Sequence, residues 1–274
     1  MVSKQSLPAP YRALVDDAAI FPPGDSPLDE ALAAFAARRD EWYADLVHSF
    51  VVRDTDLPSL PAGLPVSVVL TGGAGAVEGA VAMARKRDLV LTGLEAAVRD
   101  LDDPVGNVRR IALAVRAAEV DPDVPVYVEV PGPATGSWLT AADEAAAEAL
   151  RLKLRCGHVD HDLIPTSARI AGWLCAALDR ELEVKGTAGL HRAVRHDPEG
   201  GGAHGFLNLL VATRAVLDGA SAEDAEALLE ERDGTALASH ELGQVRRWFT
   251  SFGSCSVAEP LDDLLALGLV EAPA

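Results

Sequence analysis

Short runs of apolar and β-branched residues alternate along the chain with longer, alanine-rich stretches in which apolar residues recur at helical spacing. Eight of the short runs are predicted to form strands, and they lie at residues 14–21, 45–52, 66–71, 89–98, 124–130, 152–156, 182–187 and 252–257. Helices are predicted at residues 28–38, 76–87, 105–118, 141–150, 167–178 and 261–267, with several more between 191 and 249. Strands that alternate with helices predict a parallel sheet joined by right-handed crossovers.

The number of these strand–helix units predicts the architecture. Eight units in 274 residues fit a closed (β/α)8 TIM barrel of the α/β class. A doubly wound open sheet is the alternative, because the helices at 105–118 and 209–217 would suit that fold equally well, but no GxGxxG motif follows the first predicted strand. No linker-like segment interrupts the pattern, so residues 1–274 are predicted to form a single domain.

Composition narrows the range of partners. Apolar residues make up 49% of the chain and aromatic residues only 5%, which predicts a folded protein whose core is built mainly from Ala, Val and Leu. The 42 acidic residues exceed the 24 basic ones and give a net charge of −18. Because such a field repels phosphate backbones and anionic membranes, a nucleic-acid partner is disfavoured. An anionic substrate would need positive charge concentrated at its site.

The cysteines and the N-terminal segment predict a cytoplasmic protein without a membrane partner. Cys156, Cys175 and Cys255 are odd in number and form no CxxC pair, which argues against a disulfide framework or a structural zinc site. Residues 1–10 contain no apolar signal region, and no apolar run reaches membrane-spanning length.

Two lysines stand out at the predicted strand ends. In the sixth run, Leu152 and Leu154 share one face, which puts Lys153 and Arg155 together on the other. The outer faces of barrel strands lie under helices, where an unpaired charge is costly, so we expect the two cations to point into the barrel mouth. The alternative is that the strand begins later and Lys153 lies at a rim with its ammonium group in water.

The seventh run repeats this arrangement. Lys185 and Thr187 share a face, and Gly189 would let backbone amides approach an oxyanion or phosphate. Two lysines on adjacent strands repel, and repulsion and burial both lower the pKa of an amine, which would yield the neutral nucleophile that a Schiff base requires. The alternative is a pair of salt-bridged lysines that only bind an anion.

These strand ends resemble a known family. The spacings Lys153-x-x-x-Gly157 and Lys185-x-x-x-Gly189, followed by residues 252–256 (Phe-Gly-Ser-Cys-Ser), are similar to the last three strand ends of the deoxyribose-phosphate aldolases, which are class I, metal-free (β/α)8 enzymes. The resemblance covers the C-terminal half of the chain. It implies that the sixth-strand lysine forms the Schiff base, that the seventh-strand lysine tunes its pKa, and that no cofactor is needed.

The resemblance also implies phosphate contacts at Gly189, Ser254 and Ser256. This chain departs from the family in two places. Residues 154–156 are Leu, Arg and Cys where the family has small hydroxyl residues after the lysine, and the segment between residues 189 and 252 is longer. The motifs leave the family's catalytic aspartate without a counterpart here.

Acidic residues in other runs are candidate proton carriers. Glu129 ends the fifth run and would act beside the lysines if it points inward. Its alternative role is a salt bridge to Arg155 or Lys153. Glu95 in the fourth run has the same two interpretations. Residues 16 and 17 are both aspartate, and because neighbours on a strand face opposite sides, at most one reaches the interior.

The late histidines offer a different chemistry. His191 directly follows the seventh run and His204 lies in a Gly-rich loop that would close over the mouth, so both are predicted substrate contacts. Together with Glu129 they would form a metal site, although no signature such as HExxH is present and loop histidines are commonly solvated. Cys156 ends the sixth run, and a small, partly buried thiol is favoured over a nucleophile because no orienting histidine follows from the sequence.

Three functional hypotheses follow. The preferred one is an aldolase-like carbon–carbon lyase, or a related Schiff-base enzyme, with Lys153, Lys185 and Glu129 catalytic and Arg155 and Thr187 among the groups that hold a small anionic carbonyl compound. The second is a metal-dependent hydrolase or isomerase that uses histidine and glutamate ligands. The third is a non-catalytic barrel that binds an anionic metabolite or a partner protein.

Overall fold

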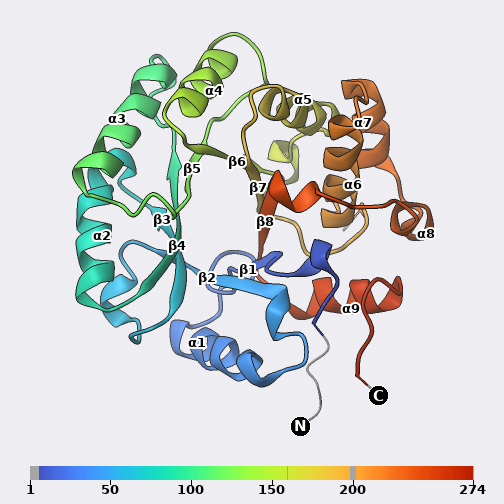
Figure 1. The fold of residues 1–274 in the computed structure, drawn as a ribbon, viewed down its shortest axis with the longest axis horizontal. Coiled ribbons are helices and arrows are strands. Elements are labelled where there is room, and N and C mark those ends of the chain that lie inside the picture. The colour runs from blue at the N-terminus through green and yellow to red at the C-terminus, as the bar shows by residue number, and fades with distance from the viewer. Residues whose placement is uncertain (1–5, 159, 198–201, 274) are drawn as a thin grey trace.

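The computed structural model of the protein describes residues 6–158, 160–197 and 202–273, and eight parallel strands close into a barrel (Figure 1). Each strand pairs with its neighbours in chain order, and β8 pairs with β1. The predicted (β/α)8 barrel is therefore confirmed. The strands are β1 Val15–Asp17, β2 Val47–Arg53, β3 Pro65–Leu70, β4 Val90–Ala97, β5 Val126–Glu129, β6 Arg151–Arg155, β7 Val184–Thr187 and β8 Phe249–Ser254.

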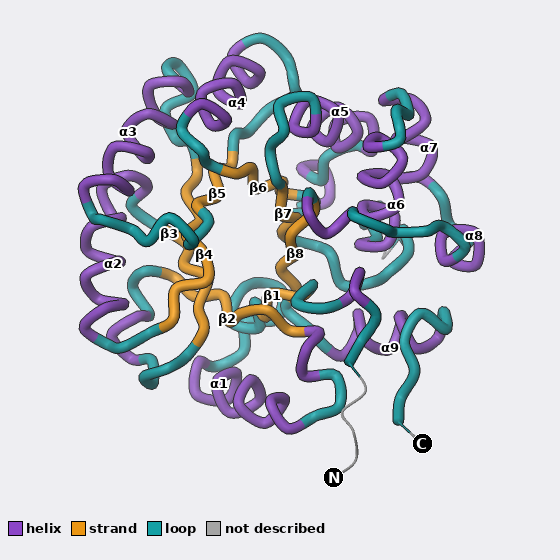
Figure 2. Tube along the Cα trace, viewed as in Figure 1, coloured by secondary structure: helices purple, strands orange, loops and turns teal. Residues whose placement is uncertain are grey.

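Helices surround the barrel on its outside, as Figure 2 shows. They are α1 Leu28–Ala37, α2 Val77–Lys86, α3 Pro104–Ala117, α4 Ser137–Ala147, α5 Ser167–Leu178, α6 Phe206–Leu217, α7 Ala222–Glu230, α8 Gly234–Ala238 and α9 Ala258–Ala266. Only a short 3-10 turn, Leu57–Ser59, lies between β2 and β3, where prolines interrupt the sequence. Within the described part of the chain, no helix combines the length and the apolar character needed to cross a membrane.

The two strands that close the barrel differ most from their predicted runs. β1 is shorter than predicted because the chain turns immediately after it, where the Phe21 amide donates to the Ala18 carbonyl oxygen at 2.8 Å. β8 begins earlier, at Phe249, and ends at Ser254. It stops there because the Ser254 hydroxyl donates to the Ser256 carbonyl oxygen at 2.6 Å and forms a turn.

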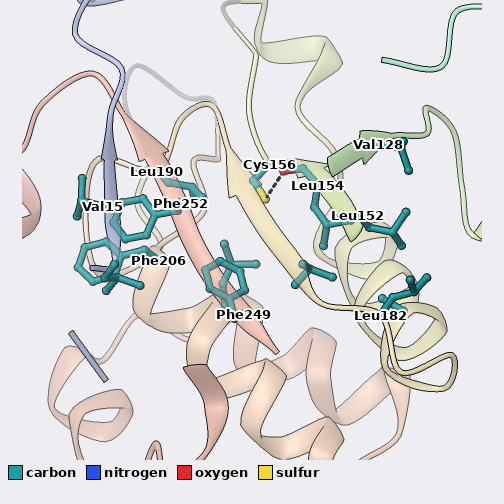
Figure 3. Close-up of a cluster of buried hydrophobic side chains, with 14 of the residues drawn as sticks. Val15, Val128, Leu152, Leu154, Cys156, Leu182, Leu190, Phe206, Phe249 and Phe252 are labelled. Carbon is teal, nitrogen blue, oxygen red and sulfur yellow. Dashed lines mark hydrogen bonds between the residues drawn. The ribbon is translucent and has the colours of Figure 1, made fainter. Parts of the chain in front are cut away.

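The apolar core lies between the strands and the helices. Figure 3 shows part of it, where the outer faces of β6, β7 and β8 meet buried apolar side chains. Leu152 and Leu154 of β6 are both buried in this layer, as their alternation with charged residues predicted. Phe252 of β8 stacks on Phe206 of α6, with ring centroids 4.8 Å apart and ring planes 13° apart. The strands therefore direct their apolar side chains outward.

Replacing Phe252 tests this packing. Phe252→Ala is expected to lower the free energy of unfolding by about 3–5 kcal/mol, because it removes a fully buried ring and leaves a cavity against Phe206. Phe252→Leu keeps most of the volume and should cost under about 1.5 kcal/mol. Urea unfolding of the three proteins measures the difference. Equal stability of Phe252→Ala and the wild type would contradict the packing.

Candidate functional site

The inside of the barrel is polar, although the interior of this fold is normally filled with branched apolar side chains. Seven strands each contribute one buried polar or charged residue that contacts this interior: Asp16, Ser49, Ser67, Glu95, Lys153, Lys185 and Ser251. The remaining strand, β5, adds Tyr127 and Glu129. Because a buried charge is costly unless it is paired, the partners of these groups define what the site can do.

Lys185 on β7 is held as a buried ion pair. Its Nζ lies 2.6 Å from Glu95 Oε1 and 2.9 Å from Asp16 Oδ2, and 5.2 Å from the centroid of the Tyr127 ring. Burial by itself lowers the pKa of an ammonium group, but the carboxylates outweigh it and hold the pKa of Lys185 above its ordinary value. The prediction that crowding lowers a lysine pKa is therefore wrong for Lys185, because the Asp16 and Glu95 carboxylates that contact it stabilise its charge.

Lys153 on β6 is the more accessible of the two lysines. Its side chain is 8% exposed, against 2% for Lys185. Its Nζ lies 3.0 Å from Glu95 Oε2 and 3.1 Å from Glu129 Oε2. Arg155 stands two residues further toward the mouth, is 48% exposed, and donates from Nε to Glu129 Oε1 at 2.6 Å. The three cations thus lie on the inner side of the barrel, as their strand positions predicted, but only Arg155 is exposed at the mouth, and Lys185 is buried deeper inside.

A single carboxylate joins the two lysines. The two oxygens of Glu95 each accept from a different ammonium group, and the Ser67 hydroxyl donates to Oε1 at 2.9 Å. Burial alone would raise the pKa of this carboxyl group, but Lys185 and Lys153 together lower the pKa of Glu95 from 4.5 to about 2. Glu95 is therefore an anion whose charge both lysines require.

The line of ion pairs ends at β1. Asp16 accepts from the hydroxyls of Ser49 and Ser251, each at 2.6 Å, and its Oδ1 lies 2.9 Å from His48 Nδ1. Burial opposes ionisation here too, but Lys185 and then His48 hold the pKa of Asp16 well below its usual range. We call the whole line the charge chain, and its members in order are Asp16, Lys185, Glu95, Lys153, Glu129 and Arg155. Its three carboxylates balance its three cations.

The glycines of the two lysine motifs have a structural explanation. A Cβ added to Gly157 would lie 2.9 Å from both the Ala188 carbonyl oxygen and Gly189 Cα, closer than real side chains approach. Gly189 also has φ +69°, a conformation that favours glycine. The loops after β6 and β7 therefore touch backbone to backbone. This contact fixes the two strand ends relative to each other and places the lysines side by side.

The predicted anion contacts near β7 and β8 have internal partners. The Thr187 hydroxyl lies 3.5 Å from the Leu154 carbonyl oxygen. The Ser254 hydroxyl donates to the Ser256 carbonyl oxygen, and Ser256 Oγ accepts from the Glu259 amide at 3.2 Å where α9 begins. The two serine hydroxyls shape the β8–α9 turn at the mouth. The role of Thr187, Ser254 and Ser256 as substrate contacts stays a prediction.

The predicted histidine contacts lie apart from each other. His191 Nδ1 is 3.2 Å from Glu259 Oε2, at the β8–α9 turn. His204 is buried, with Nε2 2.7 Å from the Pro165 carbonyl oxygen and Nδ1 3.0 Å from Arg195 Nη1, and burial together with Arg195 lowers its pKa. Nε2 of His204 thus connects the loop after β7 to the loop after β6, and Nδ1 has its partner within the loop after β7.

The proposed metal ligands His191, His204 and Glu129 therefore have three separate sets of partners. Across residues 6–158, 160–197 and 202–273, no three His, Cys, Asp or Glu side chains stand close enough together to hold a metal ion.

Two further sequence candidates face away from the interior. Asp17 forms an ion pair with Arg38, the residue that follows the C-terminal end of α1, so only one of the adjacent aspartates reaches the barrel interior, as predicted. Cys156 is buried on the outer face of β6, where its Sγ lies 3.4 Å from the Leu154 carbonyl oxygen (Figure 3). Burial raises the pKa of this thiol to about 12, which suits an inert core residue.

The sequence interpretation missed several groups of the site. Ser49, Ser67 and Ser251 each donate to a carboxylate of the charge chain, and Tyr127 lies beside the Lys185 ammonium group. A signal was present for Ser67 and Tyr127, because each lies between two buried valines on its strand, which is the pattern of a polar inner face. Ser49 and Ser251 gave a weaker signal, because each has a buried phenylalanine on one side and a polar residue on the other. Neither a family model nor a curated protein matches the chain.

The role of Glu95 leads to a prediction about stability. Glu95→Gln is expected to lower the free energy of unfolding by about 3–5 kcal/mol, because it leaves two buried ammonium groups facing a neutral amide. Glu144→Gln is the matched control, since it breaks an ion pair with the exposed Arg109 on the outside of the barrel and should cost under about 1 kcal/mol. Urea unfolding at neutral pH compares them. Similar losses in both variants would argue against the charge chain.

The lowered pKa of Glu95 also predicts how stability depends on pH. The folded-state pKa of about 2 lies below the ordinary value, so the ion pairs of Glu95 stabilise the folded state above the ordinary pKa, and this contribution is lost as the pH falls toward 2. Between about pH 5 and 2, the free energy of unfolding should therefore decrease more steeply for the wild type than for Glu95→Gln. Chemical unfolding at several pH values measures both slopes, and parallel slopes would contradict the assignment.

Proposed function

We propose that the protein is an aldolase-like carbon–carbon lyase that forms a Schiff base between Lys153 and a small anionic carbonyl compound. The observation that carries the proposal is the Lys153 amine, which lies in the barrel mouth between Glu95 and Glu129. Active sites of (β/α)8 enzymes lie at this C-terminal end of the strands. The resemblance of the lysine motifs to deoxyribose-phosphate aldolases supports the same assignment of Lys153.

Lys153 is the better nucleophile of the two lysines. Lys185 has a raised pKa and is enclosed by Asp16 and Glu95, so it keeps its proton at neutral pH. Lys153 is instead open toward the mouth and has the Glu129 carboxylate, a group that can take a proton, 3.1 Å from its Nζ. Glu95 is the carboxylate that contacts both lysines. It is the candidate for the role of the family's catalytic aspartate, which the sequence motifs left without a counterpart.

The use of lysine in this chain supports an amine function. Only four of the 24 basic residues are lysines, at positions 4, 86, 153 and 185, and two of these lie inside the barrel. Where a buried cation only has to pair with a carboxylate, arginine serves well, because it is always charged and donates two parallel hydrogen bonds. Lysine, unlike arginine, has an amine that loses its proton and adds to a carbonyl carbon.

Arg155 connects substrate binding to activation of the amine. It donates to both oxygens of Glu129, at 2.6 and 3.3 Å, and its exposed side chain is free to turn toward an arriving anion. Glu129 has a lowered pKa because Lys153 and Arg155 stabilise its charge in spite of burial. When the anionic group of the substrate takes Arg155, Glu129 becomes more basic and accepts the proton of Lys153.

The proposed reaction passes through an iminium ion and then an enamine, both attached to Lys153 Nζ. The Lys153 Nζ lone pair adds to the carbonyl carbon, and a proton moves from Nζ to the carbonyl oxygen. The resulting hydroxyl leaves as water with the proton that Glu129 took from the ammonium group, which gives an iminium ion. The carbon–carbon bond breaks as its electron pair moves into the iminium, while the Glu129 carboxylate, which has given up its proton, removes the hydroxyl proton of the departing fragment. The enamine that remains takes up a proton at carbon, and water releases the product and restores the amine.

Borohydride trapping tests the proposal. With a panel of small anionic aldehydes and ketones, reduction should attach one substrate residue to Lys153, and peptide mass spectrometry locates the modification. The exposed Lys86 is an internal control, because it reports nonspecific reaction of surface amines. Lys153→Met should abolish trapping, and Lys185→Met should reduce its rate. The proposal fails if no substrate modifies Lys153 faster than Lys86.

A further inference from the structure

A second arginine stands at the mouth of the barrel, on the wall opposite Arg155. Arg53 is the last residue of β2, and it alternates with Phe50 and Val52, which are fully buried in the outer apolar layer. Strand alternation therefore places Arg53 on the inner face. In the closed order of eight strands, β2 and β6 lie across the barrel from each other, as Figure 2 shows. The two arginines thus end opposite strands at the same edge.

The Arg53 guanidinium is oriented and has donors to spare. Its Cζ lies 4.5 Å from the centroid of the Phe21 ring, which the loop between β1 and α1 supplies. A guanidinium that lies against a ring keeps its N–H groups available for a carboxylate. Among the described residues, its only ion-pair contact is with Asp56, at 3.7 Å, which is longer than a hydrogen bond. The Asp56 carboxylate instead accepts from the Arg53 backbone amide at 3.0 Å.

The position of the lysine relative to the two arginines defines the substrate. Lys153 and Arg155 lie two residues apart on one face of β6 and share Glu129, so an acid group held by Arg155 lies next to the carbonyl carbon that Lys153 attacks. Arg53 then faces the far end of the same molecule. Near the mouth, the inward residues of β3 and β4 are Val69, which pairs in register with Arg53, and Ala97, which pairs with Glu129.

We infer that Arg53 and Phe21 form a second anion subsite and that the substrate is a 2-oxo acid with a second carboxylate at its far end. This inference rests on the proposed function for the carbonyl group and extends it by naming the substrate class. The two acid groups bind at opposite walls, and the carbonyl carbon lies over Lys153.

Matched ligands that differ by one carboxylate test the second subsite without any reaction. Isothermal titration calorimetry compares pentanedioate with pentanoate on the full chain. Pentanedioate should bind roughly tenfold to hundredfold more tightly, since the extra carboxylate gains charge-assisted hydrogen bonds to Arg53. Arg53→Met should remove this difference. Arg109→Met, which deletes an exposed cation on the outer helix α3, should leave it unchanged.

The reactive counterparts separate the two proposals. Borohydride trapping on Lys153 should be faster with 2-oxopentanedioate than with 2-oxopentanoate, and Arg53→Met should equalise the rates. Equal binding of pentanedioate and pentanoate, no binding of either, or a preference that survives in Arg53→Met overturns the second subsite. If the preference holds but neither oxo acid modifies Lys153, the Schiff-base proposal fails and the dicarboxylate subsite stands. If both oxo acids modify Lys153 at the same rate, the Schiff-base proposal stands and the second subsite fails.

Discussion

The Glu95 carboxylate is the group on which the interior of this barrel depends. Two ammonium groups on adjacent strands repel, and moving each of them out of water is costly. Glu95 accepts one hydrogen bond from each, at 2.6 and 3.0 Å, and so allows both lysines to occupy the inner face. Asp16 forms a further ion pair with Lys185, and Glu129 forms one with Lys153. The position of β4 relative to β6 and β7 therefore decides the chemistry of the site.

Much of this arrangement could be predicted from local patterns, and the errors have one cause. Alternation along a strand correctly separated Leu152 and Leu154 from Lys153 and Arg155, because it depends only on neighbouring residues. The pKa of Lys185 was predicted in the wrong direction because its carboxylate partner Glu95 is 90 residues away in sequence. Which side chains meet across a barrel depends on closure and register, and neither is encoded in the sequence around one strand.

The charge of the whole protein and the charge of the site differ. The chain carries a net charge of −18, yet the charge chain is neutral because its carboxylates and cations balance. An anion approaching the mouth therefore meets little net attraction from the buried groups. Its attraction must come from cations near the rim whose hydrogen-bond donors are available, and Arg53 is such a group. The donors of Arg155 are occupied by Glu129, so under the proposed function this arginine has to exchange Glu129 for the substrate.

The buried ion pairs also bear on whether the site is functional. Replacing a buried ion pair with well-packed apolar residues is often neutral or stabilising, and this fold normally fills its interior with branched apolar side chains. A charge chain of six residues, supported by hydroxyls from β2, β3 and β8, is thus not the arrangement that stability alone would favour. Glu129 and Arg155 of the charge chain are the last residues of their strands, and Lys153, the more accessible of the two amines, has carboxylates on both sides. An interior organised around that amine is better explained by chemistry at Lys153 than by packing.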